Sequence, residues 1–237
     1  MQKKSFKAWF ENYWYHNKWP TIIILFFVIT FIIGFSQVVL EHKVYDVYTL
    51  YAGGTYLPKE SKVEIEKVMQ DAAEKVSDTK DPKESEVNLQ MLVYLSKDRI
   101  AELEEEYEKQ GEKFVYDIKE NNDVRDTFMK QLISGENVMM ILDPELYATA
   151  EANGALYPIK EVFGRDMPGT NSTGYGMVLK DSGLSVRYSA FAALPENSII
   201  CFKKVTHAMT LIGKSSDQKE HIFQLEVAKE IFRGIGE

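Results

Sequence analysis

The feature that most constrains this chain is an uncharged run from Pro20 to Leu40, near the start of its 237 residues. Folded as a helix, a run of this length extends for about 30 Å, which matches the hydrocarbon core of a bilayer. Isoleucine and phenylalanine dominate it on all sides, and its polar residues, such as Thr30 and Ser36, are mild. A helix in a soluble core is usually apolar along one stripe only. The run therefore predicts a transmembrane helix over residues 20–40.

Aromatic and basic side chains crowd the N-terminal flank of this run. They include Trp9, Trp14, Tyr15, Lys18 and Trp19. Indole and phenol rings prefer the headgroup layer of a membrane, so we expect these residues to anchor the helix at the interface. The basic end precedes the run and Glu41 follows it. The positive-inside rule then places residues 1–19 in the cytoplasm and residues 41–237 outside the cell.

Two other interpretations of the run stay open. Gly34 and Ser36 resemble a weak cleavage site, as in a secretory signal peptide. The run is also compatible with an apolar helix that never enters a membrane. The leader of about twenty residues is long and aromatic-rich for a signal peptide, which usually has a short basic n-region. An uncleaved anchor in the cell membrane is therefore the favoured prediction, with the lipid bilayer as its partner.

The charge of the chain is divided unevenly. The overall charge is −8, and residues 1–40 contribute +3, so the remainder carries −11. A domain this acidic repels phosphate backbones, so we expect no nucleic-acid partner. The single cysteine, Cys201, rules out an intrachain disulfide and lies in an apolar run. We expect it to be a small buried hydrophobic residue.

Strand patterns and helix patterns alternate along the first half of the exposed part. Runs of β-branched and aromatic residues predict strands, and apolar residues at i, i+3, i+4 and i+7 predict helices. The expected strands cover residues 46–57, 85–96 and 138–142, and the expected helices cover 58–78, 98–111, 122–135 and 144–154. This alternation is typical of βαβ units. It predicts a three-layer α/β domain with a mostly parallel open sheet.

Local signals mark several helix ends. Ser61 and Glu64 fit a capping box for the first of these helices, which alternatively begins at Pro58. Asp143 is placed to cap the helix that follows the third strand, and Gly154 suits the end of that helix. These signals predict where individual helices begin and end.

The pattern loosens in the second half of the domain. We expect an exposed loop over 163–176, one or two short strands over 177–194, one strand or two over 198–214, and a closing helix over 215–236. In the helices, Ile133 and Ile222 are expected to point inward. No internal repeat is present.

Signals of catalysis or metal binding are weak. The histidines show no H-x-x-x-H spacing, and neither a Walker loop, a G-x-S-x-G elbow nor a G-x-G-x-x-G motif occurs. The acidic cluster over 101–113 has helical spacing with interspersed lysines, so a solvated helix face is a better interpretation than a calcium site. We therefore predict no catalytic residue, no metal and no cofactor.

Candidate ligand-binding residues follow from the predicted sheet. In open α/β sheets, ligands bind beyond the carboxyl ends of the strands. The residues at those ends are Tyr51, Gly53, Gly54 and Tyr56 after the first strand, Ser96 after the second and Asp143 after the third. Gly53-Gly54 could also expose backbone N–H groups to an anion, but a plain turn is the better interpretation of the pair.

One segment resembles a known family. The matching residues in 133–163 are Val138–Leu142, Asp143, Pro144, Leu146, Ala150, Gly154, Leu156, Pro158 and Phe163. Their pattern of strand, helix and "G-x-L-x-P" turn is similar to a segment of bacterial extracellular solute-binding proteins. The opening "DVYTLYAGG" resembles the first strand of such a lobe. With its aromatic anchor, the chain looks like small membrane-anchored proteins of Gram-positive bacteria, which implies a single solute-binding-like lobe.

These features favour a single-pass membrane protein whose extracytoplasmic domain binds a small ligand or a membrane-protein partner, without enzymatic activity. One alternative is a structural or assembly subunit of an envelope transport or secretion complex. The other is a cell-envelope hydrolase. The hydrolase requires two or more of these residues to converge: His207, His221, Asp143, Asp181 and Ser185.

Overall fold

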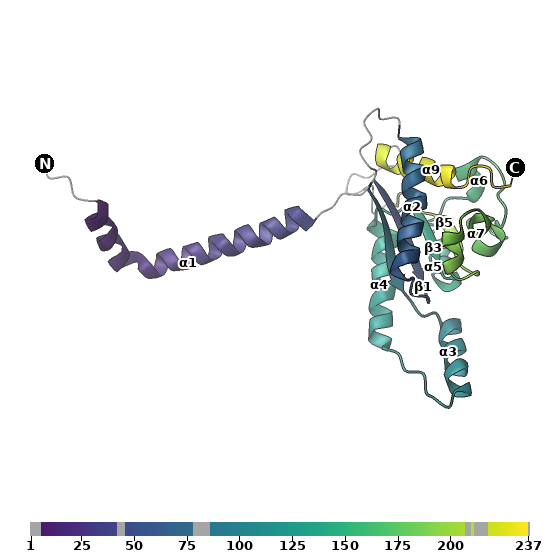
Figure 1. Cartoon of the computed structure of the whole chain (residues 1–237), viewed down its shortest axis with the longest axis horizontal. Coiled ribbons are helices and arrows are strands. Elements are labelled where there is room, and N and C mark those ends of the chain that lie inside the picture. Colours follow the sequence, from purple (N-terminus) through teal and green to yellow (C-terminus); the bar gives the residue numbers. More distant parts are fainter. Residues whose placement is uncertain (1–5, 42–45, 78–85, 207–209, 211–217, 237) are drawn as a thin grey trace. The chain divides into compact units, whose positions relative to one another are not determined.

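The computed structural model describes residues 6–41, 46–77, 86–206, 210 and 218–236 (Figure 1). It divides the chain into two compact units, Met1–Val44 and Tyr45–Glu237. The division falls where the predicted anchor gives way to the predicted α/β domain. Each unit is described by itself below.

The first unit consists of one long helix, α1 (Phe6–Glu41). Within it, Tyr13–Ile32 is long and apolar enough to cross a membrane, and it is the one such helix in the described part of the chain. This stretch overlaps the predicted span over 20–40. The helix is thus compatible with a single transmembrane span.

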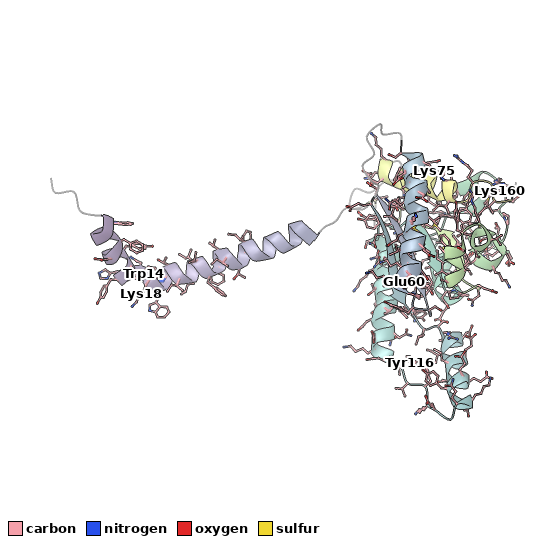
Figure 2. All side chains as sticks on the ribbon, viewed as in Figure 1. Trp14, Lys18, Glu60, Lys75, Tyr116 and Lys160 are labelled. Atoms are coloured by element: carbon pink, nitrogen blue, oxygen red, sulfur yellow. The ribbon has the colours of Figure 1, made fainter. Side chains whose placement is uncertain are left out.

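The aromatic flank of α1 folds as part of the same helix. The rings of Trp9 and Tyr13 stack with their centroids 5.7 Å apart, and those of Phe10 and Trp14 stack at 6.1 Å. Figure 2 shows Trp14 close to Lys18 on this part of the helix. Figure 1 shows α1 bending in its N-terminal third, and Pro20 lies inside the helix. A proline removes one backbone hydrogen bond and clashes with the preceding turn, which accounts for a bend.

The second unit is built on a five-stranded sheet in the order β2-β1-β3-β5-β4. The strands are β1 (Val47–Gly53), β2 (Val87–Val93), β3 (Met139–Leu142), β4 (Met177–Val178) and β5 (Ile199–Phe202). β1 pairs in parallel with β2 and β3, whereas β5 pairs antiparallel with both β3 and β4. Only β5 therefore runs against the others among the described strands. The predicted α/β class and the mostly parallel open sheet are confirmed.

Helices cover both faces of this sheet, because alternate strand residues point to opposite sides. Tyr51 and Ile141 enter a core formed with α2 (Lys59–Val76) and α9 (Lys219–Ile231). Leu50 and Met140 enter a second core, formed with α4 (Ile118–Ser134) and α5 (Pro144–Ala152). Figure 1 shows α2 and α9 on one side of the strands and α4 on the other. The central strand β3 is buried throughout, as its apolar sequence predicts.

The predicted helix ends are partly confirmed. Asp143 caps α5 by accepting a hydrogen bond from the Glu145 N–H at 2.9 Å. α2 begins after Pro58, so the alternative start is the observed one. Ile133 and Ile222, expected inward, are instead exposed. Each lies near a helix end.

The second half of the domain differs from its prediction. Strand structure over 177–194 is limited to β4, and the rest forms the short turns η1 (Leu179–Asp181), α7 (Leu184–Arg187) and η2 (Ser189–Ala193). Gly183 adopts a positive φ of 76°, which breaks any extended run there. Isolated apolar residues such as Phe191 are buried by these turns without alternation. Much of the possible second strand over 198–214 lies outside the described residues.

An arm of two helices extends from the carboxyl ends of the strands. It contains α3 (Lys97–Lys109), which buries none of its residues, and the N-terminal half of α4 (Figure 1). Three aromatic rings pack together in the arm. The ring centroids of Tyr107 and Phe114 lie 5.3 Å apart, and those of Phe114 and Tyr116 lie 5.8 Å apart. Figure 2 shows Tyr116 on the connection between the two helices. α6 (Ile159–Phe163) completes the described helices on the α9 side.

Candidate functional site

A cavity of about 500 Å³ lies at the carboxyl ends of β1 and β3. The chain leaves β1 for β2 on one side and later returns to β3 on the other, so the cavity sits at the switch point of the sheet. Ligands of open α/β sheets bind at such points. We call it the acid cavity. It is lined by Gly54, Thr55, Ser96, Asp98, Arg99, Glu102, Asp143, Pro144, Glu145, Ala193, Leu194, Pro195, Glu196 and Asn197.

Two helix caps meet in this cavity. Ser96 caps α3, and its Oγ accepts a hydrogen bond from the Arg99 N–H at 3.4 Å. The same Oγ donates to Asp143 Oδ2 at 3.2 Å. Asp143 Oδ1 in turn accepts from the first turn of α5. The N-termini of α3 and α5 are therefore linked by the hydrogen bond between the Ser96 and Asp143 side chains.

A second carboxylate strengthens this junction. Glu145 Oε1 accepts a hydrogen bond from the Tyr94 hydroxyl at 3.0 Å, and Glu145 Oε2 accepts from the Lys97 N–H at 3.1 Å. Burial and the bond to Glu145 raise the pKa of Tyr94 to about 12. Tyr94 therefore stays a neutral donor, and Glu145 is held in place at the cavity wall.

Gly54 lets the stem of Arg99 pass close to the β1 turn. A Cβ at Gly54 would lie 2.9 Å from the Arg99 Cγ. The Arg99 Nη1 lies 2.9 Å from Glu102 Oε2 and 3.5 Å from Glu106 Oε1, both on α3. The one cationic side chain among the lining residues is thus already paired with carboxylates.

The electrostatic character of the cavity is negative. Five of its lining residues carry carboxylates, namely Asp98, Glu102, Asp143, Glu145 and Glu196. Burial raises the pKa of Asp143, with smaller raising contributions from the charges of Glu145 and Asp98, although hydrogen bonds oppose the shift. Like charges that lie this close disfavour one another's ionised form and favour a cation between them.

The structure brings three of the predicted ligand-binding residues into this cavity: Gly54, Ser96 and Asp143. Tyr51 is fully buried beneath it, and its hydroxyl accepts a hydrogen bond from the Thr55 N–H at 3.3 Å. Gly53 allows that approach, because its Cβ would lie 2.9 Å from the Tyr51 hydroxyl. Tyr56 is exposed and faces a different hollow.

Sequence reasoning missed most of the charged lining. Asp98 and Glu102 belong to a helix whose acidic residues were interpreted as a solvated face. The opposite wall, 193–197, follows η2 and reaches the cavity only through tertiary folding. For Asp98 and Glu102, the acidic pattern along α3 was the available signal in the sequence.

The residues considered for a hydrolase lie in separate environments. His221 is on α9, with its Nε2 3.3 Å from the Tyr157 hydroxyl, whereas Asp143 bonds Ser96 at the cavity. Asp181 lies on the exposed turn η1, and His207 lies outside the described residues. Across the described ranges, no group of three or more His, Cys, Asp or Glu side chains is placed to hold a metal ion.

Comparison with known proteins identifies no relative of this chain. No family model, no curated protein and no solved structure matches it. The resemblance to solute-binding proteins therefore stays a prediction from the sequence. Any function must be inferred from the residues of the chain itself.

Proposed function

We propose that this chain is a single-pass membrane protein whose α/β domain binds a small cationic ligand, such as a primary amine, in the acid cavity. The observation that carries the proposal is the excess of carboxylates in a cavity at the switch point of the sheet. A volume of about 500 Å³ is in the range of small-molecule sites. The cavity is concave, as a ligand site requires, but carboxylates line it rather than the tyrosines expected from the sequence.

An anionic ligand fits the cavity less well. Helix N-termini attract anions when their N–H groups are open. Here the starts of α3 and α5 are already capped by Ser96 and Asp143. An incoming anion would also meet the carboxylates of Glu145 and Glu196. A cation instead gains attraction from every one of these groups.

The test is a binding screen with the full chain in lipid nanodiscs. Amines, including amino acids and polyamines, should raise the thermal midpoint, whereas neutral sugars and dicarboxylates should not. Asp143→Asn should weaken binding of the best amine about tenfold, because one attractive charge is removed while the helix cap is kept. Binding should also weaken with added salt.

A matched control is available on the surface. Asp166 is exposed, and its carboxylate lies 3.5 Å from Lys160 Nζ on α6. Asp166→Asn removes the same charge without touching the acid cavity, so amine binding should be unchanged. Equal loss in both variants, or a screen in which dicarboxylates bind and amines do not, would reject the cationic ligand.

The proposed location is the cell membrane, with the N-terminus in the cytoplasm and the α/β domain outside. Support comes from the long apolar helix with its aromatic and basic N-terminal flank. Protease added to intact cells should degrade the domain and leave a membrane-embedded fragment that starts at residue 1. A protected domain would reverse the topology, and a mature chain that starts near Gln37 would replace the anchor with a signal peptide.

We further propose that the domain corresponds to one lobe of an extracellular solute-binding protein. The segment that carries the resemblance forms β3, α5, a turn at Gly154 and the start of α6 after Pro158. Gly154 adopts a positive φ of 63°, so a glycine is favoured at this turn. An experimental structure with a bound amine would test the correspondence through the position of the ligand at the strand ends.

A second candidate function, assembly with a membrane-protein partner, is favoured by the arm. α3 buries none of its residues, and near the tip of the arm Val115 and Ile118 are 78% and 63% exposed. Exposed apolar residues at the end of a projection are typical of contact sites. Val115→Ser with Ile118→Ser should abolish co-purification with such a partner without changing amine binding. If co-purification persists, the arm is not the contact.

A further inference from the structure

A second hollow of about 820 Å³ runs along β2, the strand at one border of the sheet. We call it the edge trough. Its lining residues come from both sides of β2 and from β1, α2 and α4. They are Tyr48, Thr49, Tyr56, Leu57, Lys59, Lys62, Asn88, Leu89, Gln90, Met91, Gln131, Gly135, Glu136 and Asn137. It shares no lining residue with the acid cavity.

The backbone of β2 has a border that no other strand covers in the described part of the chain. On this border the Leu89 N–H donates to Glu66 Oε1 of α2 at 3.0 Å. Backbone groups of a strand point alternately to its two sides, so those of Val87, Met91 and Val93 face the same way. An uncovered border of this kind is a template for pairing with another strand. A side chain, Glu66, occupies one of its positions.

The trough contains polar groups that lack partners. Asn137 is only 3% exposed, and neither its Oδ1 nor its Nδ2 has a hydrogen bond. The Thr49 Oγ1 is buried and unpartnered in the same way. A buried polar group without a partner costs about 1–3 kcal/mol, so a hydrogen bond supplied from outside would be favourable at these positions. The other carboxamides that line the trough are Asn88, Gln90 and Gln131.

The position of Asn137 is fixed by its surroundings. A Cβ at Gly135 would lie 2.2 Å from Gln131 Oε1 and 2.6 Å from Asn137 Oδ1. Glycine is therefore required for the two carboxamides to approach here. Lys203, which is 1% exposed, donates from Nζ to the Gln131 and Gly135 carbonyls and holds this end of α4. The backbone that precedes the unpartnered amide is thus held by a buried lysine.

Charge differs along the trough. Lys59 and Lys62 lie at its α2 end, where Lys62 Nζ is 3.6 Å from Glu66 Oε1, and Glu136 is the one carboxylate among the lining residues. The N-cap of α2 is Pro58, which makes no side-chain cap, so the first N–H groups of this helix are not satisfied by a capping side chain. Both features favour an acidic group at this end. Uncharged carboxamides line other positions of the trough.

We propose that the border of β2 binds an extended peptide segment of a partner protein as an additional β-strand. An acidic group of the peptide would lie near Lys59 and Lys62, and an uncharged polar side chain would reach Asn137. A strand is the occupant that fits, because its backbone pairs with the outward groups of β2 while its side chains alternate between the two sides of the trough. A carboxamide offers a donor and an acceptor side by side, which an Asn, Gln, Ser or Thr side chain can satisfy.

The first experiment selects peptides with the full chain in nanodiscs. A displayed library of random ten-residue peptides is the probe. Enriched sequences should carry an acidic residue at one end and Asn, Gln, Ser or Thr at positions that differ by an even number of residues. The same library should lose this enrichment on Asn137→Ala. Enrichment without any such spacing, or no enrichment at all, overturns the proposal.

The second experiment tests backbone pairing directly. One enriched peptide is synthesised with a single N-methyl group at each position in turn. Strand addition predicts that affinity falls about tenfold or more at alternate positions only, since every second N–H points to β2. Uniform effects, or none, overturn strand addition. Binding of neutral oligosaccharides in place of peptides also overturns it.

Two variants and a control distinguish an effect on peptide binding in the trough from an effect on the stability of the domain. Glu66→Ala vacates the Leu89 N–H and should tighten peptide binding several-fold. Asn137→Ala should weaken it about tenfold. Asn197→Ala, in the acid cavity, should leave it unchanged. The proposal fails if the Asn197 variant loses as much as the Asn137 variant, or if Glu66→Ala weakens binding. Amine binding in the acid cavity is measured in parallel, so the proposal for one site can be rejected while the proposal for the other stands.

Discussion

The acid cavity and the edge trough differ in how their polar groups are satisfied. In the cavity, Ser96, Asp143 and Glu145 are joined to helix N–H groups and to one another by hydrogen bonds. In the trough, the buried side-chain polar atoms of Asn137 and Thr49 make no hydrogen bond. The carboxylates of the cavity wall are hydrogen-bonded, whereas in the trough the side-chain amide of Asn137, next to Glu136, is not.

The two hollows therefore illustrate two different physical arrangements of a binding site in the ligand-free protein. A satisfied, negative cavity attracts a cation through its field and needs no change when the ligand leaves. An unsatisfied amide instead costs stability in the free protein, and the ligand relieves that cost. Removing a polar group should therefore cost stability in the cavity but little or none in the trough, and the following predictions compare the two regions from the largest effect to the smallest.

The largest effect is expected from Lys203, which supports the wall of the trough. Burial lowers the pKa of Lys203 to about 8 from 10.5. Between these values the unfolded chain binds more protons than the folded one, so stability should rise with pH across this window, by up to about 3 kcal/mol. Denaturant melts from pH 7.5 to 10.5 measure the rise.

Lys203→Met should flatten this rise, while Lys204→Met, at the neighbouring half-buried residue, should keep it. A neutral lysine amine still has two N–H donors, so both bonds to the α4 carbonyls persist above pH 8. Equal pH slopes in the wild type and the Lys203 variant would contradict the assignment.

The next effect compares glycines in the walls of the two hollows. Gly135→Ala should cost about 2 kcal/mol, because the added Cβ would meet the backbone carbonyl of Gln131 at 2.5 Å as well as two side chains. Gly54→Ala should stay within about 0.5 kcal/mol, since Arg99 is flexible and alanine restricts the unfolded chain. Urea melts of both variants decide the comparison. Equal losses of stability in the two variants would contradict a difference in rigidity between the wall of the trough and the wall of the cavity.

A third comparison removes one polar group from each site. Tyr94→Phe deletes the hydrogen bond to Glu145 and should cost about 1 kcal/mol. Asn137→Ala deletes a group without a hydrogen bond and should be within about 0.5 kcal/mol of the wild type or more stable. Chemical denaturation measures both. The prediction is contradicted if the Asn137→Ala variant is less stable than the Tyr94→Phe variant.

The smallest effect is expected from Asp143→Asn at neutral pH. Asparagine caps helices as well as aspartate does, so stability should change by less than about 0.5 kcal/mol. At low pH the variant should differ. Burial raises the pKa of Asp143, so the folded wild type takes up its proton before the unfolded chain does. Its stability relative to the variant should therefore increase as the pH falls toward 3.8.

The sequence was most informative where elements alternate regularly. The inward positions of α2, such as Ile65 and Met69, and the apolar run of β3 were predicted correctly, because periodicity records which side is buried. The turns over 179–193 were not predicted. Their apolar residues Leu179, Leu184 and Phe191 are buried one at a time, so no period marks them.

The two sites were predictable to different extents. Gly54, Ser96 and Asp143 follow strands, and the carboxyl ends of parallel strands must meet, so sequence order alone placed them together. The edge trough depends on which strand ends at the border and on the missing partners of Asn137. Neither property is local. Strand order and hydrogen-bond satisfaction exist only once the whole sheet is packed.

The antiparallel strand β5 has a consequence for biosynthesis. β3 has β1 on one side, but its other neighbour is supplied by residues 199–202, and α9 then packs on α2. While the ribosome is still upstream of Ile199, β3 lacks this neighbour and its backbone is open. We therefore expect a nascent domain that completes its fold only after most of it has left the ribosome and that needs protection from aggregation until then.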